Sequence, residues 1–473
     1  MKKLIRTLGL AALTLSAAAW GQLTDTTVVT ARVTVPVSGA AGWTDVLANC
    51  PTGLVALSGG IDSNDFLSVE ITTLAPTFGN SALAFQADGM HAAADGWYAS
   101  LKNYGAVEHP VTLSVVCAAL PDAVVSIASG TASAGSIEFP GTGGAVAYCP
   151  AGYAAIGGGA DLAMPASMKV SALAPRFGFD YLIDRPAGSG SPPTGWSANV
   201  RNEGAAGTMK VAATCTQLAG LSAVATGPFT IDPGTASGYS AACPAGSFAV
   251  GGGVDTNQIA TTAATVNSPR FGSSPQSPAD RAPGSYASAT GWYGIYYNYG
   301  PGAATGSVGI VCAQPTPNVA LVYEFYNSGL RHYFRTASAE EAAAIDRGAA
   351  GPNWIRTGDN FYAYTAGSAS PGSDVCRFYT SGANSHFYTA FASECASLKS
   401  PSSGWTYEGL SFRIPLPSGP GCAAGTLPVY RLYNNRYAYN DSNHRFTTVY
   451  GNIAALQAQG WTYEGIAFCA LNY

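Results

Sequence analysis

Short stretches of alternating apolar and polar residues, separated by Gly, Pro and Asn turns, run along most of this chain. LSVVC, VAATC and VGIVC are three such stretches, and each ends in a cysteine. Alternation with a period of two predicts half-buried β-strands, and the frequent turns predict antiparallel pairing. We therefore expect an all-β protein built from small antiparallel sandwiches or jelly rolls over its first two thirds.

The first two thirds contain three copies of one pattern, here called large copies 1, 2 and 3. They open with CPTGLVALSGGID, CPAGYAAIGGGAD and CPAGSFAVGGGVD, and each continues with a Phe-Gly turn, a Gly-Trp strand and a strand ending in cysteine. The copies predict three successive domains at residues 22–121, 122–219 and 220–317, the last including a Pro-rich linker. Near-equal cysteine spacing predicts the disulfides Cys50–Cys117, Cys149–Cys215 and Cys243–Cys312.

A tryptophan and an aspartate recur in each large copy. Trp97, Trp196 and Trp292 lie in the middle of a strand. We interpret them as core residues near the disulfide, with a sugar-stacking platform as the alternative. Asp62, Asp161 and Asp255 follow the glycine run. We expect each to cap the following turn, because calcium, the alternative, needs six or more oxygen ligands.

Residues 58–63, SGGIDS, match the phosphate-binding loop of ATP pyrophosphatases. The other copies read GGGAD and GGGVDT at this offset, and the loop lies close to a predicted disulfide. We therefore reject a nucleotide site and interpret the glycines as a bulge or a tight strand crossing. The large copies resemble small Cys-Pro-x-Gly…Gly-Gly-Gly…Trp…Cys modules of bacterial exported proteins, a resemblance that implies no activity.

After a Pro-rich linker at residues 313–319, the composition shifts to Tyr, Phe, Trp, Arg and Asn. Three short copies follow, containing VYEFYN, VCRFYT and VYRLYN, then HYFRT, HFYTA and HRFTT, then a helical stretch and a strand opening with Trp. Residues 318–473 resemble a bacterial exported module with the hallmarks VYRFYN, HFYT and GWxYEG, which is catalogued only as a domain of unknown function. The resemblance implies an accessory module, often found beside cell-wall-active or peptidase domains, and no reaction.

We expect the three short copies, each strand–strand–helix–strand, to close around a pseudo-threefold axis, since one copy could not bury its aromatic face alone. The four cysteines of this region can form two disulfides in three ways. Proximity along the chain favours the combination of Cys376–Cys395 with Cys422–Cys469. The copies differ at two positions. Thr357 stands where the others have Glu408 and Glu464, and Asn452 stands where a helix glutamate, Glu340 or Glu394, is expected.

His332, His386 and His444 occupy one slot of the short copies in this alignment. Three converging imidazoles could bind zinc. The competing interpretation, which we favour, is that each His hydrogen-bonds within its own copy, for instance to the Glu of GWTYEG. No cofactor is expected.

The N-terminus and the overall charge bear on compartment and partners. Lys2, Lys3 and Arg6 precede an apolar run at residues 8–20 and small residues, which predicts a signal peptide at residues 1–21. Ten cysteines also favour an exported, disulfide-bonded chain, secreted or periplasmic, without a membrane span. The net charge of −5 and the 10% content of charged residues argue against a nucleic-acid partner.

Binding is better supported than catalysis. No GxSxG or HExxH motif is present, and Glu408 and Glu464 are repeat-related, unlike an acid/base pair. We hypothesise a non-catalytic protein that recognises a polysaccharide or another cell-surface component through its C-terminal aromatic residues. The candidates are Trp354, Trp405, Tyr407, Trp461 and Tyr463. The alternatives are a structural or protein-adhesive stalk with these residues in the core, and an envelope-polymer hydrolase.

Overall fold

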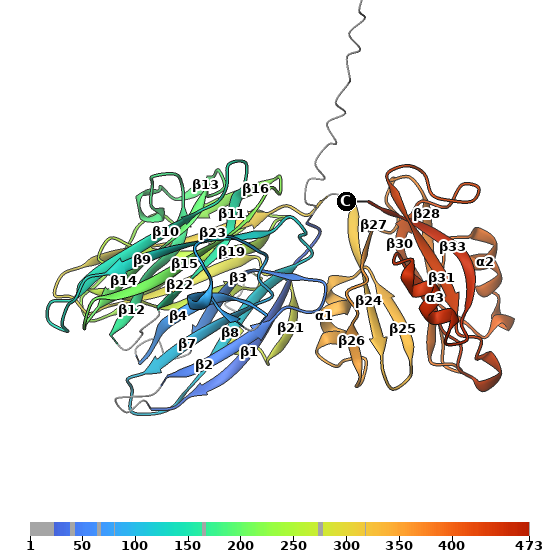
Figure 1. Cartoon of the computed structure of the whole chain (residues 1–473), viewed down its shortest axis with the longest axis horizontal. Helices are drawn as coiled ribbons and strands as arrows, with labels where there is room; N and C mark the ends of the chain where they lie inside the picture. The colour runs from blue at the N-terminus through green and yellow to red at the C-terminus, as the bar shows by residue number, and fades with distance from the viewer. Residues whose placement is uncertain are drawn as a thin grey trace, which may run out of the picture.

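The computed structural model describes residues 23–37, 43–63, 68–79, 81–162, 167–272, 278–316 and 318–472. The predicted signal peptide lies outside these ranges. Two parts are visible in Figure 1: a larger part formed by the three large copies, here called the N-terminal body, and a smaller C-terminal domain. Both are built mainly from antiparallel strands, which confirms the predicted all-β, multidomain class. No helix within the described ranges is long and apolar enough to cross a bilayer.

Each large copy is a sandwich of two layers, with its tryptophan between them. Each layer has three strands, and in copy 3 one edge strand is interrupted and forms two short strands. The strands of copy 1 are β1 (Thr27–Val35), β8 (His109–Ala118) and β3 (Val55–Ser63), facing β2 (Thr44–Asn49), β7 (Gly96–Asn103) and β4 (Val69–Phe78). Those of copy 2 are β9 (Val124–Ala132), β15 (Gly207–Thr216) and β11 (Ala154–Leu162), facing β10 (Gly141–Tyr148), β14 (Gly195–Asn202) and β12 (Met168–Arg176). Those of copy 3 are β16 (Leu221–Ala225), β17 (Phe229–Ile231), β23 (Ala304–Ala313) and β19 (Phe248–Thr256), facing β18 (Ala236–Ala242), β22 (Gly291–Asn298) and β20 (Thr262–Arg270).

The sandwich interior confirms the core interpretation of the tryptophans. Trp97, Trp196 and Trp292 are all 0% exposed, so none can serve as a sugar platform. All five predicted disulfides are present: Cys50–Cys117, Cys149–Cys215, Cys243–Cys312, Cys376–Cys395 and Cys422–Cys469. Disulfides of this number indicate an oxidising compartment rather than the cytoplasm.

The large copies close on one another in a ring. The glycine-run strand of each copy pairs with a strand of a neighbour: β11 with β4, β19 with β12, and β3 with β20. The three glycine-run strands also contact one another pairwise. They therefore surround a pseudo-threefold axis, and the copies form one body rather than a row of separate sandwiches.

The glycine run provides the close approach that this axis requires. The first position of the run is Ser58, Gly157 or Gly251, and a Cβ at Gly157 would overlap the carbonyl oxygen of Leu57 in copy 1. At the second position, a Cβ at Gly158 would overlap the ring of Trp196 in the same copy. At the third position, a Cβ at Gly159 would lie 2.6 Å from the carbonyl oxygen of Leu74 in the neighbouring copy. A register shift precedes the run in every copy, so bulge and strand crossing are both confirmed.

The recurring aspartates fasten the ring, which corrects the expectation that each caps the turn following it. A short 3₁₀ helix and strand project from each copy as an arm onto the next: η1–β6 (Leu83–Phe85, Gly89–Ala92), η2–β13 (Leu182–Asp184, Gly188–Gly190) and η3–β21 (Pro278–Asp280, Gly284–Ala287). The arms pair with β9, β16 and β1 respectively.

In each case the aspartate of the receiving copy accepts a backbone N–H from the arm. Asp161 accepts from Ala84 at 2.7 Å. Asp255 accepts from Ile183 at 3.0 Å, and its burial raises its pKa to about 6. Asp62 accepts from Ala279 at 3.1 Å, which joins copy 3 to copy 1 and completes the ring. The sequence alignment located these residues, but the partner lies in another copy and was not predictable from local turn chemistry.

The C-terminal domain has the expected strand–strand–helix–strand order in each short copy. Copy 1 contains β24 (Val319–Asn327), β25 (His332–Thr336), α1 (Ala339–Asp346), β26 (Trp354–Arg356) and β27 (Phe361–Tyr364). Copy 2 contains β28 (Ser373–Thr380), β29 (Ser385–Thr389), α2 (Ala392–Leu398), η4 (Pro401–Ser403) and β30 (Thr406–Ile414). Copy 3 contains β31 (Thr426–Tyr433), η5 (Tyr437–Tyr439), β32 (His444–Thr447), α3 (Gly451–Gln457) and β33 (Thr462–Leu471).

The last strands of the three short copies meet at the centre of the domain. β27 pairs with both β30 and β33, and Phe361, Phe412 and Phe468 pack edge to face with centroid distances of 5.9 and 6.0 Å. These three residues occupy equivalent positions, so the domain closes around its own pseudo-threefold axis. The domain docks on the N-terminal body through hydrogen bonds of Tyr323 to Asp25 and of Tyr362 to the carbonyl of Ala119.

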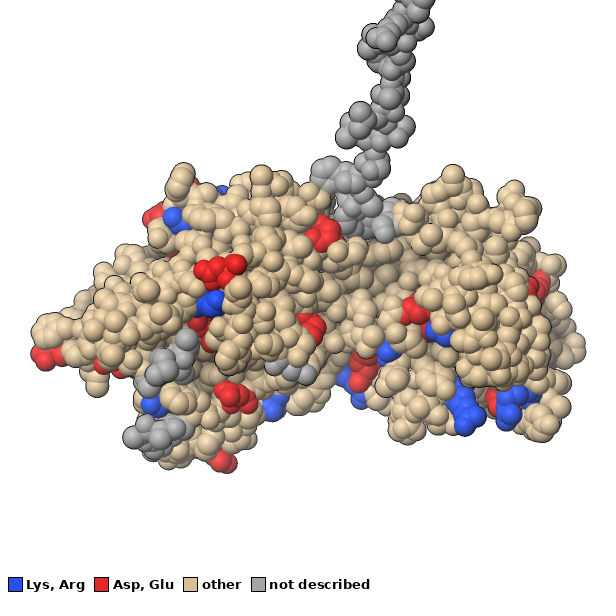
Figure 2. All heavy atoms as spheres, in the orientation of Figure 1, with Lys and Arg blue, Asp and Glu red and all other residues tan. Residues whose placement is uncertain are grey.

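Few charged side chains are visible on the face of the molecule drawn in Figure 2, where they occur in small mixed groups. Most of that surface is formed by uncharged residues, as expected from a chain with 10% charged residues. This face presents no broad basic area of the kind that a nucleic-acid backbone requires.

Gly157→Ala tests the packing at the axis of the N-terminal body. The new methyl group would meet backbone and Ser58 Cβ of a neighbouring copy, with little room for either to move. We expect the free energy of unfolding to fall by about 1–3 kcal/mol, the usual cost of overpacking. Differential scanning calorimetry of the full chain measures the change.

Gly302→Ala is the matched control, because its Cβ would meet nothing within 4 Å. We expect this variant to unfold within about 0.5 kcal/mol of the parent. Equal stability of the two variants would contradict the close approach at the axis.

Candidate functional site

Strand register in the short copies corrects the alignment of the histidines. Tyr326 lies opposite Tyr333 in copy 1, Tyr379 opposite His386 in copy 2, and Tyr433 opposite His444 in copy 3. The residue equivalent to His386 and His444 is therefore Tyr333, and His332 is one position earlier. His332 bonds instead to Asp441 of copy 3 at 2.7 Å.

This register removes the threefold histidine set on which a zinc site would depend. Within the described parts of the chain, no group of three His, Cys, Asp or Glu residues could hold a metal ion. The competing interpretation holds for two histidines: His386 lies 3.3 Å from Glu408, and His444 lies 3.4 Å from Glu464. Burial, with the nearby Arg377 charge, lowers the pKa of His386 to about 4, so this ring is neutral at pH 7.

An arginine bridges two glutamates at the junction of short copies 1 and 2. Arg377 contacts Glu408 of its own copy at 2.9 Å and Glu341 of helix α1 at 2.7 Å. The helix carboxylate at this position is therefore Glu341, and the alignment that placed Glu340 there is wrong by one residue. Glu408 is held by Arg377 and His386 of its own copy.

The junction of copies 2 and 3 repeats this arrangement. Arg431 contacts Glu464 at 2.9 Å and Glu394 of helix α2 at 3.2 Å. Because Glu394 stands in α2 where Glu341 stands in α1, both junctions join a helix of one copy to strands of the next by the same ion pairs.

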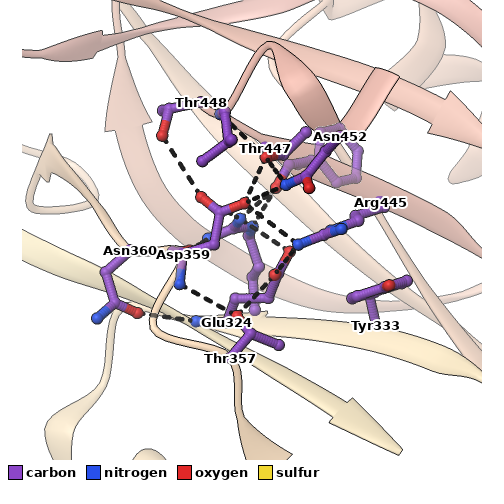
Figure 3. Close-up of polar contacts among 12 residues, drawn as sticks. Glu324, Tyr333, Thr357, Asp359, Asn360, Arg445, Thr447, Thr448 and Asn452 are labelled. Atoms are coloured by element: carbon purple, nitrogen blue, oxygen red, sulfur yellow. Dashed lines mark hydrogen bonds and ion pairs between the residues drawn. The ribbon is translucent and has the colours of Figure 1, made fainter. Parts of the chain in front are cut away.

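The junction of copies 3 and 1 reverses the charges (Figure 3). Glu324 occupies the position of Arg377 and Arg431, and Arg445 occupies the position of the apolar Phe334 and Phe387. Arg445 and Arg335 each lie 2.9 Å from a carboxylate oxygen of Glu324. These opposite substitutions compensate each other across the junction.

Asp359 completes this buried ionic cluster and lies beside Glu324 and Arg445 in Figure 3. The fourth member of its core is Arg335, which contacts both carboxylates. The Asp359 carboxylate lies 3.3 Å from Arg445 and 3.7 Å from Arg335, and it also accepts hydrogen bonds from Thr447 and Asn452. Thr357, which replaces the strand glutamate, donates to Glu324 at 2.7 Å. The Glu324 side chain is 0% exposed, so a substrate cannot reach it, and the cluster acts as a lock between copies.

Two pockets lie on either side of the β24–β25 hairpin, and both are formed where short copies meet. The first, with a volume of about 550 Å³, lies between copies 1 and 2. Its walls include Asn353, Trp354, Phe334, Asn384 and His386. Glu341 also lines it, so one pocket offers an indole face, amides, a neutral imidazole and a carboxylate.

The second pocket, with a volume of about 570 Å³, lies between copies 3 and 1. Tyr326, Tyr333 and Trp461 form its aromatic walls, and Tyr333 packs edge to face on Trp461 at a centroid distance of 5.9 Å. Arg445 of the buried cluster lies over the Tyr333 ring at 4.4 Å. The ionic lock therefore also supports one wall of this pocket.

The two pockets are pseudo-equivalent, because each combines the tryptophan of one copy with the hairpin of the next. The equivalent pairs are Trp354 and Trp461, His386 and Tyr333, Asn384 and Arg331, Asn327 and Asn434, and Ile345 and Leu456. Gly329 and Leu330 of the intervening hairpin line both pockets. The same architecture thus presents two related concave surfaces side by side.

The five aromatic residues predicted from the sequence divide between these pockets and other places. Trp354 lines the first pocket and Trp461 the second. Trp405 packs 6.0 Å from Phe387 at the remaining junction, and Tyr463 packs 6.1 Å from Tyr430. Tyr407 is 39% exposed, with Lys399 over its ring. The last three residues line neither pocket.

Sequence reasoning missed the ionic cluster and the hairpin residue Arg331. The charge reversal at Glu324, where the other copies carry Arg377 and Arg431, was the available signal for the cluster. The importance of Arg331 could be predicted only with the correct strand register, because Arg331 is equivalent to Asn384 only when Tyr333 is aligned with His386.

A family model described as "Domain of unknown function (DUF5648)" matches residues 321–471. This match confirms the resemblance of the C-terminal third to a module of unknown function, and it includes the ionic cluster and both pockets. The search of curated proteins found no match for the chain.

Arg445→Met tests the ionic lock. Methionine fills similar space but leaves Glu324 and Asp359 with a single guanidinium between them. Since breaking a buried ion pair from one side typically costs 3–5 kcal/mol, we expect the C-terminal domain to lose about 3 kcal/mol of stability. Calorimetry of the full chain measures this loss.

Lys399→Met is the control, because Lys399 is exposed and its ammonium lies over the Tyr407 ring. We expect a change of about 0.5 kcal/mol or less. If Arg445→Met were as mild as Lys399→Met, the cluster would not hold the copies together.

Proposed function

We propose that this chain is an exported, non-catalytic binding protein that recognises carbohydrate in the two pockets beside the β24–β25 hairpin. The observation that carries this proposal is the repetition of one pocket design, with Trp354 in the first pocket and Trp461 in the second. Aromatic faces bind the apolar faces of sugar rings, and amides and carboxylates fix sugar hydroxyls.

The polar groups of the first pocket support a sugar ligand. Asn353 and Asn384 offer amides, Glu341 offers a carboxylate acceptor, and His386 offers a neutral ring. Sugar hydroxyls can donate to the carboxylate, and they can both donate to and accept from the amides and the neutral imidazole, whereas a purely apolar ligand would use none of these groups. Two neighbouring pockets would also let one polymer occupy both sites and gain avidity.

Export is part of the same proposal, and we place the chain in the periplasm or outside the cell. The support is the predicted signal peptide together with five disulfides. Polysaccharide and other envelope material are the partners available there. In this arrangement the N-terminal body would act as a rigid base for the C-terminal domain.

A protein-adhesive role is the second candidate, and it is favoured by exposed aromatic residues on the N-terminal body. Phe85, Phe139 and Phe179 are 83%, 74% and 92% exposed, and exposed apolar surface can serve as a contact for a protein partner. These residues would contact a protein partner directly and would leave the two pockets without a role.

Trp354→Ala and Trp461→Ala test carbohydrate binding. We expect each variant of the full chain to bind insoluble peptidoglycan or polysaccharide about tenfold more weakly than the parent, since an aromatic anchor commonly contributes more than 1 kcal/mol. The double variant should lose retention. Pull-down assays measure binding, and circular dichroism checks that each variant folds.

Tyr407→Ala serves as the control, because Tyr407 is a partly exposed aromatic of the same domain that lines neither pocket. Its binding should equal that of the parent. Unchanged retention of the folded double variant would refute the pocket assignment. Failure of the parent chain to bind any polymer would favour the protein-adhesive role.

A further inference from the structure

The two pseudo-equivalent pockets differ in charge at one position of the hairpin turn. In the first pocket this position is Asn384, and in the second it is Arg331. Each residue is the last of the four turn residues that join the two strands of its hairpin. The pairings of Asn327 with His332 and of Thr380 with Ser385 define these turns. The arginine is therefore a feature of the second pocket alone.

The backbone at this position is unfavourable for arginine. Arg331 has φ 61° and Asn384 has φ 45°, so both residues lie in the left-handed region. Asparagine tolerates this conformation because its short amide can bond locally, whereas a long side chain pays a penalty on the order of 1 kcal/mol. The presence of arginine in this unfavourable conformation indicates a functional role for its guanidinium group.

Arg331 is also the unbalanced charge of the second pocket. The pocket contains one carboxylate, Asp441, which is already engaged by Arg436, by His332 at 2.7 Å and by Asn434 at 3.1 Å. The exposed Arg331 guanidinium has no ion pair, side-chain hydrogen bond or ring contact with any residue that the structure describes. The pocket therefore offers a free cation beside its aromatic walls.

We infer that the second pocket takes a sugar residue that carries a carboxylate, with Arg331 as the residue that selects it. Guanidinium and carboxylate match as planar, bidentate partners, and charge-assisted hydrogen bonds are about twice as strong as neutral ones. Trp461 and Tyr326 would cover the ring of the sugar while Arg331 holds its acid group. This inference rests on the proposed function and names its ligand class, an acidic polysaccharide that the second of the two pockets recognises.

The test compares two ligands with the same sugar rings, one with charged carboxylates and one with neutral methyl esters. Oligogalacturonate carries free carboxylates, and its methyl ester has the same rings without the charge. We expect the full chain to bind the free acid at least tenfold more tightly than the ester, as measured by isothermal titration calorimetry. Raising the salt concentration should reduce this preference, because a partly exposed ion pair is screened.

Arg331→Asn is the decisive variant, because it installs the residue that the first pocket already has in the same backbone conformation. It should fold at least as well as the parent and bind acid and ester equally. The reciprocal variant Asn384→Arg should increase the preference for the acid by adding a second cation site.

The outcomes separate this inference from the proposed function. Equal binding of acid and ester by the parent would overturn the inference and leave carbohydrate binding standing. A preference for the acid that persists in folded Arg331→Asn would also overturn it, because the selecting charge would lie elsewhere. If neither oligomer bound while neutral polymers were retained in the pull-down, the acidic ligand class would be wrong and the proposed function would remain.

Discussion

The close approach of three backbones at the axis of the N-terminal body is the constraint on which the rest of its structure depends. Ser58, Gly157 and Gly251 leave no space for larger side chains between the strands β3, β11 and β19. When these strands meet, the edge of each glycine-run strand pairs with a strand of a neighbouring copy: β11 with β4, β19 with β12, and β3 with β20. The arms and their aspartates then fasten each copy to the next, so the stability of one copy depends on all three.

The C-terminal domain uses the same principle with different chemistry. Its copies pair through their last strands at the centre, and ion pairs and aromatic contacts join them where the N-terminal body uses arms. Two junctions use an arginine between two glutamates. The third junction reverses these charges around Glu324 and Asp359. Pockets form at two of these junctions because neighbouring copies leave concave surfaces between a helix, a tryptophan and a hairpin. The proposed ligand preference depends on a departure from symmetry, the replacement of the equivalent of Asn384 by Arg331.

The sequence was sufficient for features that depend on local pattern. Cysteine spacing predicted the three disulfides of the large copies, and proximity within the domain favoured Cys376–Cys395 and Cys422–Cys469. Alternation predicted the strands and the buried Trp97, Trp196 and Trp292. Features that depend on contacts between copies were not predictable, because no local pattern reports which neighbour an edge or a side chain will meet. Asp255 was recognised as a recurring residue, but its partner Ile183 lies on another copy.

The register between short repeats is also difficult to predict from their sequences alone. HYFRT and HFYTA share their first letter, yet β-strand register places Tyr333 rather than His332 against Tyr326. One residue of error assigned three histidines to one slot and concealed the equivalence of Arg331 and Asn384. Trp354 and Trp461 could be predicted as candidate site residues because tryptophan is rare and recurs at the same position of each short copy, where the last strand begins. Trp405, although equivalent in sequence, packs on Phe387 of its own copy and lines neither pocket.

Native-state hydrogen exchange on the full chain tests most directly whether the large copies form one interdependent body. The amides to compare are those of the glycine-run strands β3, β11 and β19. If the ring closes as described, the slowest amides of all three strands will show the same opening free energy, because none can open without breaking its neighbours' pairing. A lower opening free energy in one strand, with the other two still protected, would contradict this account and indicate three independent sandwiches.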